Sequence, residues 1–414
     1  MLEVLRNTSY AKLFSAQVVA LLGTGLLTIA LGLLAFDIAG GDAGIVLGTA
    51  LTIKMLAYVG VAPVVAALTG HLPRKLVLIS ADVLRAAVAV SLPFVTEAWQ
   101  IYVLIFVLQS ASATFTPAFQ AVIPEILPDE AQYTRALLLS RLAYDLEALL
   151  SPMLAAALLT VISYNNLFVG TFLGFLGSAL LVVATRFPLL PPLEPARFVD
   201  RLTRGARVFW RTPELRSLLA MNLVVATATA MVIVNTVVLV QAELGRPQVD
   251  VALLFAAYGT GSMLVALALP RLLDRVRDLR VMLTGAIALP LGLLASALVI
   301  ALPTTGATWV MLAVVWFYLG AVTSLILTPS ARLLRRASEP RNRTAVFAAQ
   351  FSLSHACFIL TYPAAGILGA MLGLPAVAII LALVGVGAAI AALLAARART
   401  TVSLEPSEGR EVRG

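Results

Sequence analysis

Residues 374–396 read LPAVAIILALVGVGAAIAALLAA, 23 consecutive positions without a charged side chain, and Arg397 follows directly. A helix rises about 1.5 Å per residue, so a stretch of this length crosses the roughly 30 Å hydrocarbon core of a bilayer. The rest of the chain has the same character, because 61% of its 414 residues are hydrophobic and 12% are charged, with a mean hydropathy of +0.99. The sequence therefore predicts an integral membrane protein.

Eleven further apolar stretches precede this one. Windows of about 20 residues place them at 11–37, 44–69, 76–96, 99–122, 137–160, 165–185, 216–242, 248–270, 281–301, 306–328 and 344–366. We therefore predict an all-α integral membrane fold with twelve transmembrane helices in two six-helix, pseudo-symmetric halves. The predicted organisation is a first half at 1–186, a cytoplasmic linker with an amphipathic helix at 187–215, a second half at 216–396 and a cytoplasmic tail at 397–414.

Lys and Arg lie in every second gap between the predicted helices. Those alternate gaps contain 25 of the chain's 29 Lys and Arg residues. Cytoplasmic loops retain basic residues, so both termini and the linker are predicted to be cytoplasmic in a multi-pass protein of the plasma (inner) membrane. Basic residues at helix ends contact anionic lipid headgroups, so the net charge of +8 does not call for a nucleic-acid partner.

The sequence contains none of the common catalytic or nucleotide-binding motifs. The chain has one cysteine, Cys357, so a disulfide framework or a thiolate metal cluster is excluded. No Walker-type phosphate loop, His-Glu zinc motif or Gly-x-Ser-x-Gly elbow occurs. The sequence therefore predicts a protein that is not an enzyme and needs no cofactor.

The two halves resemble each other weakly. The fourth predicted helix ends at Thr116-Pro117-Ala118, and the tenth ends at Thr328-Pro329-Ser330. Duplicated helical halves place a substrate pathway at their interface near the bilayer midplane and permit alternating access. The sequence therefore predicts a secondary transporter of a small-molecule substrate.

Three local strings carry a resemblance to a known family. They are Asp82-Val83-Leu84-Arg85, Thr212-Pro213-Glu214-Leu215-Arg216 and the loop 272–280, LLDRVRDLR. With these strings and its twelve spans, the chain resembles the major facilitator superfamily, in the drug-efflux branch that contains macrolide and siderophore exporters and has nickel-resistance-type permeases as near relatives. The resemblance implies a monomer that exports a small, partly apolar compound in exchange for protons.

The same resemblance implies a cytoplasmic gate. The family's loop after the second span usually has a Gly, an Asp-Arg pair and a basic pair, whereas 66–75 reads AALTGHLPRK and keeps only the basic pair. The copy at 272–280 keeps more of the signature. The implied gate residues are Arg74, Lys75, Asp274 and Arg275, together with Asp82, Arg85 and Arg141 inside spans.

Ionisable residues inside spans are candidates for ion coupling, because each costs about 2.5 kcal/mol or more to insert. Arg141 and Asp145 are four residues apart, at the spacing of a local ion pair. Glu147 lies off that face, about 15 Å deep if the span begins near 137. Either Glu147 or Asp145 exchanges protons, or both serve structural pairing. Lys54, at comparable depth in the second span, is a further coupling candidate without an acidic neighbour at helical spacing.

The eleventh predicted helix has a broad polar and aromatic face, which suits a cavity wall. The substrate-contact candidates are His355, Gln350, Ser354, Tyr362, Tyr144, Asn222 and Asn235. For Asn222 and Asn235, hydrogen bonding between helices is as good an explanation as contact with a substrate. His355 and Cys357 lie two residues apart, about 200° round a helix, so they cannot chelate one metal ion together, and no resident metal site is predicted.

Two other functions stay open at this point. A divalent-metal efflux permease of the nickel or cobalt type would lose resistance on His355→Ala. A non-transporting membrane receptor or assembly factor that kept the fold would show no gradient-dependent flux, and the reduced loop at 66–75 is the feature in its favour.

Overall fold

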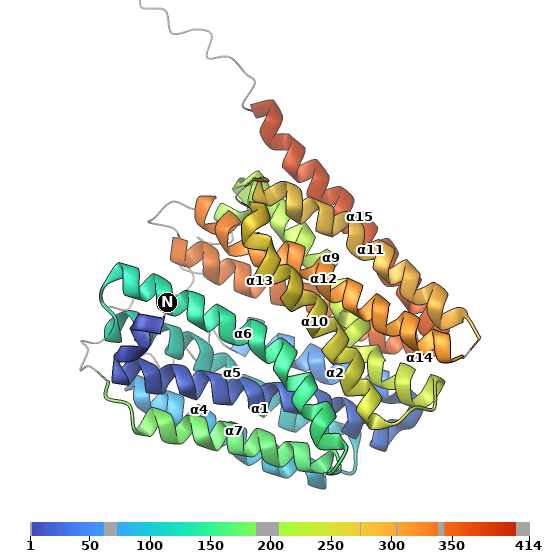
Figure 1. Ribbon diagram of the computed structural model, residues 1–414, viewed down its shortest axis with the longest axis horizontal. Helices are drawn as coiled ribbons and strands as arrows, with labels where there is room; N and C mark the ends of the chain where they lie inside the picture. Colours follow the sequence, from blue (N-terminus) through green and yellow to red (C-terminus); the bar gives the residue numbers. More distant parts are fainter. Residues whose placement is uncertain are drawn as a thin grey trace, which may run out of the picture.

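The structure of the protein is a computed structural model. It describes residues 2–61, 73–187, 207–273, 275–303, 305–337 and 343–402, apart from some side chains within helices. The described chain is almost entirely helical (Figure 1).

The first half begins with a short 3-10 helix, η1 (Leu2–Arg6), and contains six long helices. They are α1 (Thr8–Ala39), α2 (Ala43–Leu56), α4 (Arg74–Ser91), α5 (Ala98–Ile126), α6 (Glu130–Leu159) and α7 (Asn165–Val183). The 3-10 turn η2 (Gly40–Asp42) joins α1 to α2, and α2 continues as a π-helical turn, η3 (Ala57–Val61).

The second half repeats this arrangement. Its helices are α9 (Pro213–Val237), α10 (Gln248–Leu273), α11 (Asp278–Ala301), α12 (Gly306–Arg336), α13 (Arg343–Pro363) and α15 (Leu374–Val402). Two of them continue in π-helical turns, α9 as η5 (Val238–Glu243) and α13 as η6 (Ala364–Leu368). The short α14 (Gly369–Leu372) leads from η6 to α15.

Each of the twelve predicted spans overlaps one of these helices, and the predicted fold class is confirmed. Ten stretches of the described residues are long and apolar enough to cross a membrane, and one of them, Thr8–Gly60, contains both α1 and α2. Several predicted spans were too short, because they left out the polar turns at the ends of the helices. For example, α6 begins at Glu130, where Asp129 caps it by accepting from the Gln132 backbone N–H, and α12 runs to Arg336. Helices extend past the apolar core, and a hydropathy window does not detect those turns.

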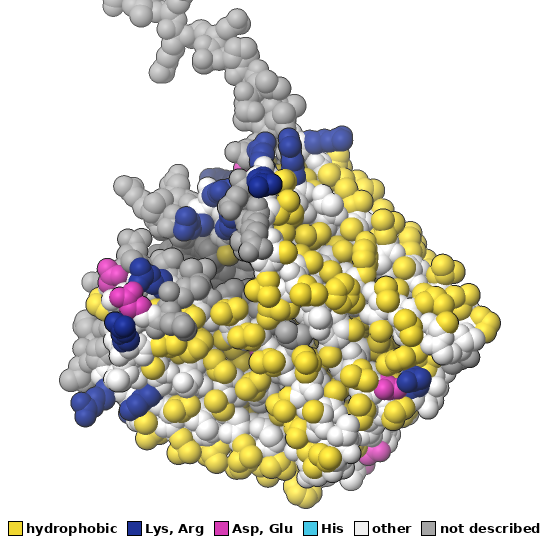
Figure 2. Space-filling view, in the orientation of Figure 1, with side chains coloured by type: hydrophobic (Ala, Val, Ile, Leu, Met, Phe, Trp, Pro, Cys, Tyr) yellow, Lys and Arg dark blue, Asp and Glu magenta, His cyan; other side chains and the backbone are white. Residues whose placement is uncertain are grey.

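The helices pack into two bundles. In the first, α1 lies against α6 and α7, and α4 against α5 and α7; in the second, α9 lies against α15, and α12 against α10 and α11. Glycines allow the closest approaches between helices, for example at Gly174. A Cβ on Gly174 would lie 3.0 Å from the Gly23 Cα. Figure 2 shows hydrophobic side chains over most of the visible face and most of the Lys and Arg side chains along its upper and left edge, as expected for a protein surrounded by lipid.

The two halves meet most closely where α2 crosses α13 and η6, and where α10 crosses α6. At the first crossing, a Cβ on Gly48 would lie 2.7 Å from the Tyr362 carbonyl oxygen, and one on Gly366 would lie 2.1 Å from the Gly44 carbonyl oxygen. We call Gly44, Gly48 and Gly366 the glycine seam. It lies near the end of the bundle that carries η2 and η5, which also contact each other.

A buried ion pair stabilises the first half. The Arg85 guanidinium donates to Asp82 one turn earlier on α4, and the Ser178 hydroxyl of α7 donates to the other carboxylate oxygen at 2.7 Å. The guanidinium also lies 4.3 Å from the Phe115 ring centroid and 4.6 Å from that of Phe175. Asp82 and Arg85 therefore contact partners within one half, and their role in the gate stays a prediction.

We expect Asp82→Asn to lower the stability of the protein by about 3 kcal/mol, because it leaves a buried guanidinium without a counter-charge. Thermal unfolding of the purified protein in detergent, followed by size-exclusion chromatography, measures the loss. Ser178→Ala is the matched control and removes one hydrogen bond, worth about 1 kcal/mol. An unchanged melting temperature for Asp82→Asn would contradict this account.

Candidate functional site

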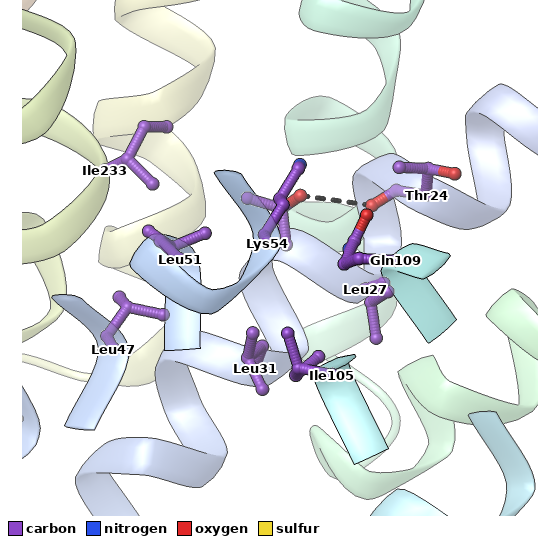
Figure 3. A pocket seen from close by; sticks show the side chains of 10 residues that line it. Thr24, Leu27, Leu31, Leu47, Leu51, Lys54, Ile105, Gln109 and Ile233 are labelled. Atoms are coloured by element: carbon purple, nitrogen blue, oxygen red, sulfur yellow. Dashed lines mark hydrogen bonds between the residues drawn. The ribbon is translucent and has the colours of Figure 1, made fainter. Parts of the chain in front are cut away.

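A small cavity lies between α1, α2 and α5 of the first half, and Ile233 of α9, in the second half, completes its lining. It has a volume of about 20 Å³, room for a single water molecule. Lys54, in the last turn of α2, reaches into it beside Gln109 of α5 and Thr24 of α1 (Figure 3). The remaining lining is Thr28 and aliphatic side chains, so Lys54 brings a charge into apolar surroundings.

Glu147 approaches the same stretch of α1 from α6. A Cβ on Gly25 would lie 2.6 Å from the Glu147 Oε1 atom and 2.2 Å from the Ser151 Oγ atom. Gly25 therefore lets α6 bring a carboxyl and a hydroxyl against the α1 backbone. The Ser151 Oγ atom is buried and has no hydrogen-bond partner among the described residues.

The structure brings two of the predicted coupling residues together. Lys54 and Glu147 lie around one turn of α1, since Lys54 lines a cavity with Thr24 and Thr28, and Glu147 lies against Gly25 between them. Their opposite charges attract each other, although no direct ion pair joins them among the described contacts. The side chains of the other two ionisable residues predicted in this span, Arg141 and Asp145, lie outside the described residues.

An aromatic cluster continues from Lys54 into the second half. The Lys54 ammonium lies 5.8 Å from the ring centroid of Tyr58, on η3. The Tyr58 ring makes edge contacts with His355 at 5.2 Å and Phe351 at 5.9 Å, both on α13. The His355 Nδ1 atom lies 2.6 Å from the Phe351 carbonyl oxygen, so Nδ1–H donates there. We call Tyr58, Phe351 and His355 the seam cluster.

The other cavity candidates take different positions. Asn222 donates to the Gln350 side chain at 3.2 Å, which joins α9 to α13. Ser354 donates to the Phe351 carbonyl oxygen of its own helix, and Tyr362 is buried and stacks on Phe358. Tyr144, on α6, is 39% exposed.

Asn235 is buried beside the glycine seam. Its side-chain amide donates to the Ala365 carbonyl oxygen at 3.2 Å, and its Oδ1 atom would lie 3.3 Å from a Cβ on Gly44. Asn235 therefore acts as a polar contact between helices in this conformation, the alternative that the sequence left open.

Besides the Asp82–Arg85 pair, the predicted gate residue Lys75 contacts the end of a neighbouring helix. Its ammonium donates to the carbonyl oxygens of Val183 at 2.6 Å and Thr185 at 3.0 Å. It therefore caps the carboxyl end of α7, where the helix dipole favours a cation. Arg74 starts α4, Arg275 is exposed, and Asp274 lies outside the described residues.

The structure shows a charge cluster at the second-half loop that the sequence analysis did not single out. Asp278, at the start of α11, is 3% exposed and pairs with Arg336 at 2.9 Å and Arg332 at 3.4 Å, both on α12. The family resemblance instead implied gate contacts at Asp274, four residues earlier. An Asp in the first turn of a helix, favoured by the helix dipole, was the signal that could have identified Asp278.

The aromatic partner of Lys54 was also missed. Tyr58 follows Lys54 by four residues and therefore lies on the same helical face. Its contact with His355 depends on how α2 and α13 cross, which the sequence alone does not specify. Within the described part of the chain, no group of three His, Cys, Asp or Glu side chains is placed to hold a metal ion.

Of the predicted linker helix, residues 207–211 belong to the described chain and are helical. Phe209 is buried against the protein, while Trp210 is 62% exposed. The amphipathic helix of the linker stays a prediction.

Comparison with known proteins identifies a family that covers most of the chain and individual relatives that cover about half of it. The family model described as Major Facilitator Superfamily matches residues 13–289 and 218–413. Macrolide efflux protein A of Streptococcus pyogenes is 26% identical over 216 residues, which cover 50% of this chain and 52% of that protein. An uncharacterised MFS-type transporter of Bacillus subtilis (strain 168), YfiS, is 26% identical over 211 residues, 49% of this chain and 50% of that protein. The chain thus spans about half the length of the curated relatives it matches.

Solved structures share the fold over nearly the full length. A bacterial homologue of the human lysosomal transporter Spinster, in an inward-facing and unoccupied conformation, has a TM-score of 0.73 at 14% identity, with 98% of this chain and 99% of that chain covered. The nucleoside transporter NupG has a TM-score of 0.69 at 14% identity, with 94% of this chain and 99% of that chain covered. At such low identity, these likenesses concern the fold alone.

Proposed function

The chain belongs to the Major Facilitator Superfamily of membrane transporters, and from this membership we propose that it exports a small, partly apolar compound in exchange for protons. Export is suggested by the relatives named macrolide efflux proteins. We propose that the protein works as a monomer in the plasma membrane, with both termini in the cytoplasm, as the distribution of basic residues predicts.

The proposed proton exchange rests on the position of the Glu147 carboxyl. This carboxyl lies against the backbone of α1 near the middle of the helices, far from the basic ends. A carboxyl in apolar surroundings exchanges a proton readily when its access to water alternates between the two sides. A substrate bound nearby competes with that proton, which is the requirement for exchange.

Alternating access requires that the halves separate at one end while they close at the other. The close backbone contacts of the glycine seam support such a movement, because they involve two separately packed bundles. The seam cluster lies at the same interface and connects Lys54 of the first half to α13 of the second. A compound bound at this interface contacts the aromatic rings and lies close to the charged pair.

Everted membrane vesicles test the proposed function directly. Respiration acidifies their interior, and a pH-sensitive dye reports protons that leave when a compound enters in exchange. We expect erythromycin or another apolar drug to trigger proton release in vesicles with the protein, and no release in vesicles without it. Release triggered by Ni(II) or Co(II) alone would favour a metal permease, and no release with any compound would overturn proton-coupled export.

A further inference from the structure

Lys54 places a second charge beside Glu147, and proton exchange by the carboxyl does not by itself require it. A lysine within a membrane helix costs about 2.5–3.5 kcal/mol on insertion scales, so its position calls for a partner or a function. Lys54 shares its cavity with neutral side chains (Figure 3), and its ammonium lies over the ring of Tyr58. These contacts hold the cation in place without neutralising it.

Glu147 provides a negative charge near the Lys54 ammonium. Glu147 lies against Gly25, and Lys54 lines the cavity beside Thr24 and Thr28 on the same turn of α1. The two charges attract each other, although the contacts of the described residues include no direct ion pair between them. In apolar protein, such an attraction is screened much less than in water.

Proton exchange leaves Glu147 negatively charged for part of the transport cycle, and the nearby Lys54 can balance that charge. When the proton leaves, Glu147 becomes a carboxylate in apolar surroundings, which is unfavourable without a nearby positive charge. A cationic substrate brings that charge with it. An uncharged substrate does not, so the protein itself must provide it.

We propose that Lys54 is the resident counter-ion of Glu147 and that it allows the transporter to exchange protons for uncharged apolar compounds. The inference rests on the proposed function and names the substrate class for that same site. Protonation of Glu147 releases Lys54 from the attraction, and deprotonation restores it. Other described titratable groups around the pair are Tyr58, Tyr144 and His355, and Arg85 is already paired with Asp82.

The exchange has a defined electrical consequence. One proton exchanged for one uncharged molecule moves one positive charge across the membrane, whereas one proton exchanged for one monovalent cation moves none. Transport of an uncharged compound therefore responds to the membrane potential, and transport of its cationic analogue at the same stoichiometry does not.

Carbodiimide labelling tests the counter-ion without a substrate, because hydrophobic carbodiimides react with protonated carboxyls. In the full-length protein in lipid nanodiscs, we expect Lys54→Met to extend labelling of Glu147 to a pH at least about one unit higher, a tenfold change in proton affinity. Lys54→Arg should follow the wild type, and Glu147→Gln should remove the labelled peptide from the mass spectrum. Identical labelling curves for wild type and Lys54→Met would overturn the proposal.

Transport of two erythromycin derivatives tests the substrate class. The N-oxide is uncharged at neutral pH, and the N-methyl quaternary derivative is a permanent cation. In proteoliposomes, we expect Lys54→Met to raise the ratio of cation to N-oxide transport at least about tenfold, and Lys54→Arg to keep the wild-type ratio. An unchanged ratio in Lys54→Met would overturn the inference. Failure of the wild type to exchange protons for either compound would count against the proposed function instead, and the labelling result would still decide the role of Lys54.

Discussion

Glu147→Gln is expected to reduce compound-triggered proton release in everted vesicles to the level of vesicles without the protein. Glutamine keeps the size of the side chain and its packing against Gly25, but it does not take up and release a proton. The pH-sensitive dye measures the loss. Exchange of labelled for unlabelled compound across proteoliposomes should persist, because the halves can still alternate around a bound substrate.

Two variants serve as controls for this experiment. Ser151→Ala changes the neighbouring hydroxyl one turn along α6 and should leave proton release intact, because Ser151 carries no exchangeable charge. Asp145→Asn tests the other carboxyl that the sequence proposed for coupling. Proton release that survives in Glu147→Gln and disappears in Asp145→Asn would move the coupling site to Asp145. Loss of compound exchange as well in Glu147→Gln would indicate a damaged protein and leave Glu147 without support.

The sequence predicted most of this fold because a bilayer imposes simple rules on length and composition. The twelve spans and their order follow from hydropathy alone. Helix ends were less accurate, as at Glu130 and Arg336, because polar turns continue each helix beyond the apolar window. The residue boundaries of the two halves and the orientation of the termini stay predictions.

Side chains that meet across helices were harder to predict. The cost of inserting an ionisable residue marked both Glu147 and Lys54, but helical spacing finds partners only within one helix. Their shared position around the turn at Gly25 depends on how α1, α2 and α6 cross. Asp82 and Arg85 show the converse case, since they are three residues apart on one helix, α4, and the structure contains their ion pair. Long-range packing therefore decides which isolated charges become a site.

The glycine seam leads to the second large expected effect. A Cβ on Gly366 would lie 2.1 Å from the Gly44 carbonyl oxygen, far inside van der Waals contact, and the obstacle is backbone that cannot rotate away. Gly366→Leu must therefore force α13 away from α2. Each half retains its own helix packing, so we expect the protein to fold and insert but to lose transport, because the halves no longer close at this end.

Cross-linking measures that closure separately from transport. Asp42 of η2 and Glu243 of η5 are exposed, and their elements contact each other across the halves. With both replaced by cysteine in a Cys357→Ser background, a short bismaleimide should join them in the wild-type sequence and much less in Gly366→Leu. Gly387→Leu is the matched control, because a Cβ there meets nothing within 4 Å. Wild-type transport and full cross-linking in Gly366→Leu would show that the helices separate at this point without cost, and that the seam does not limit the movement of the halves.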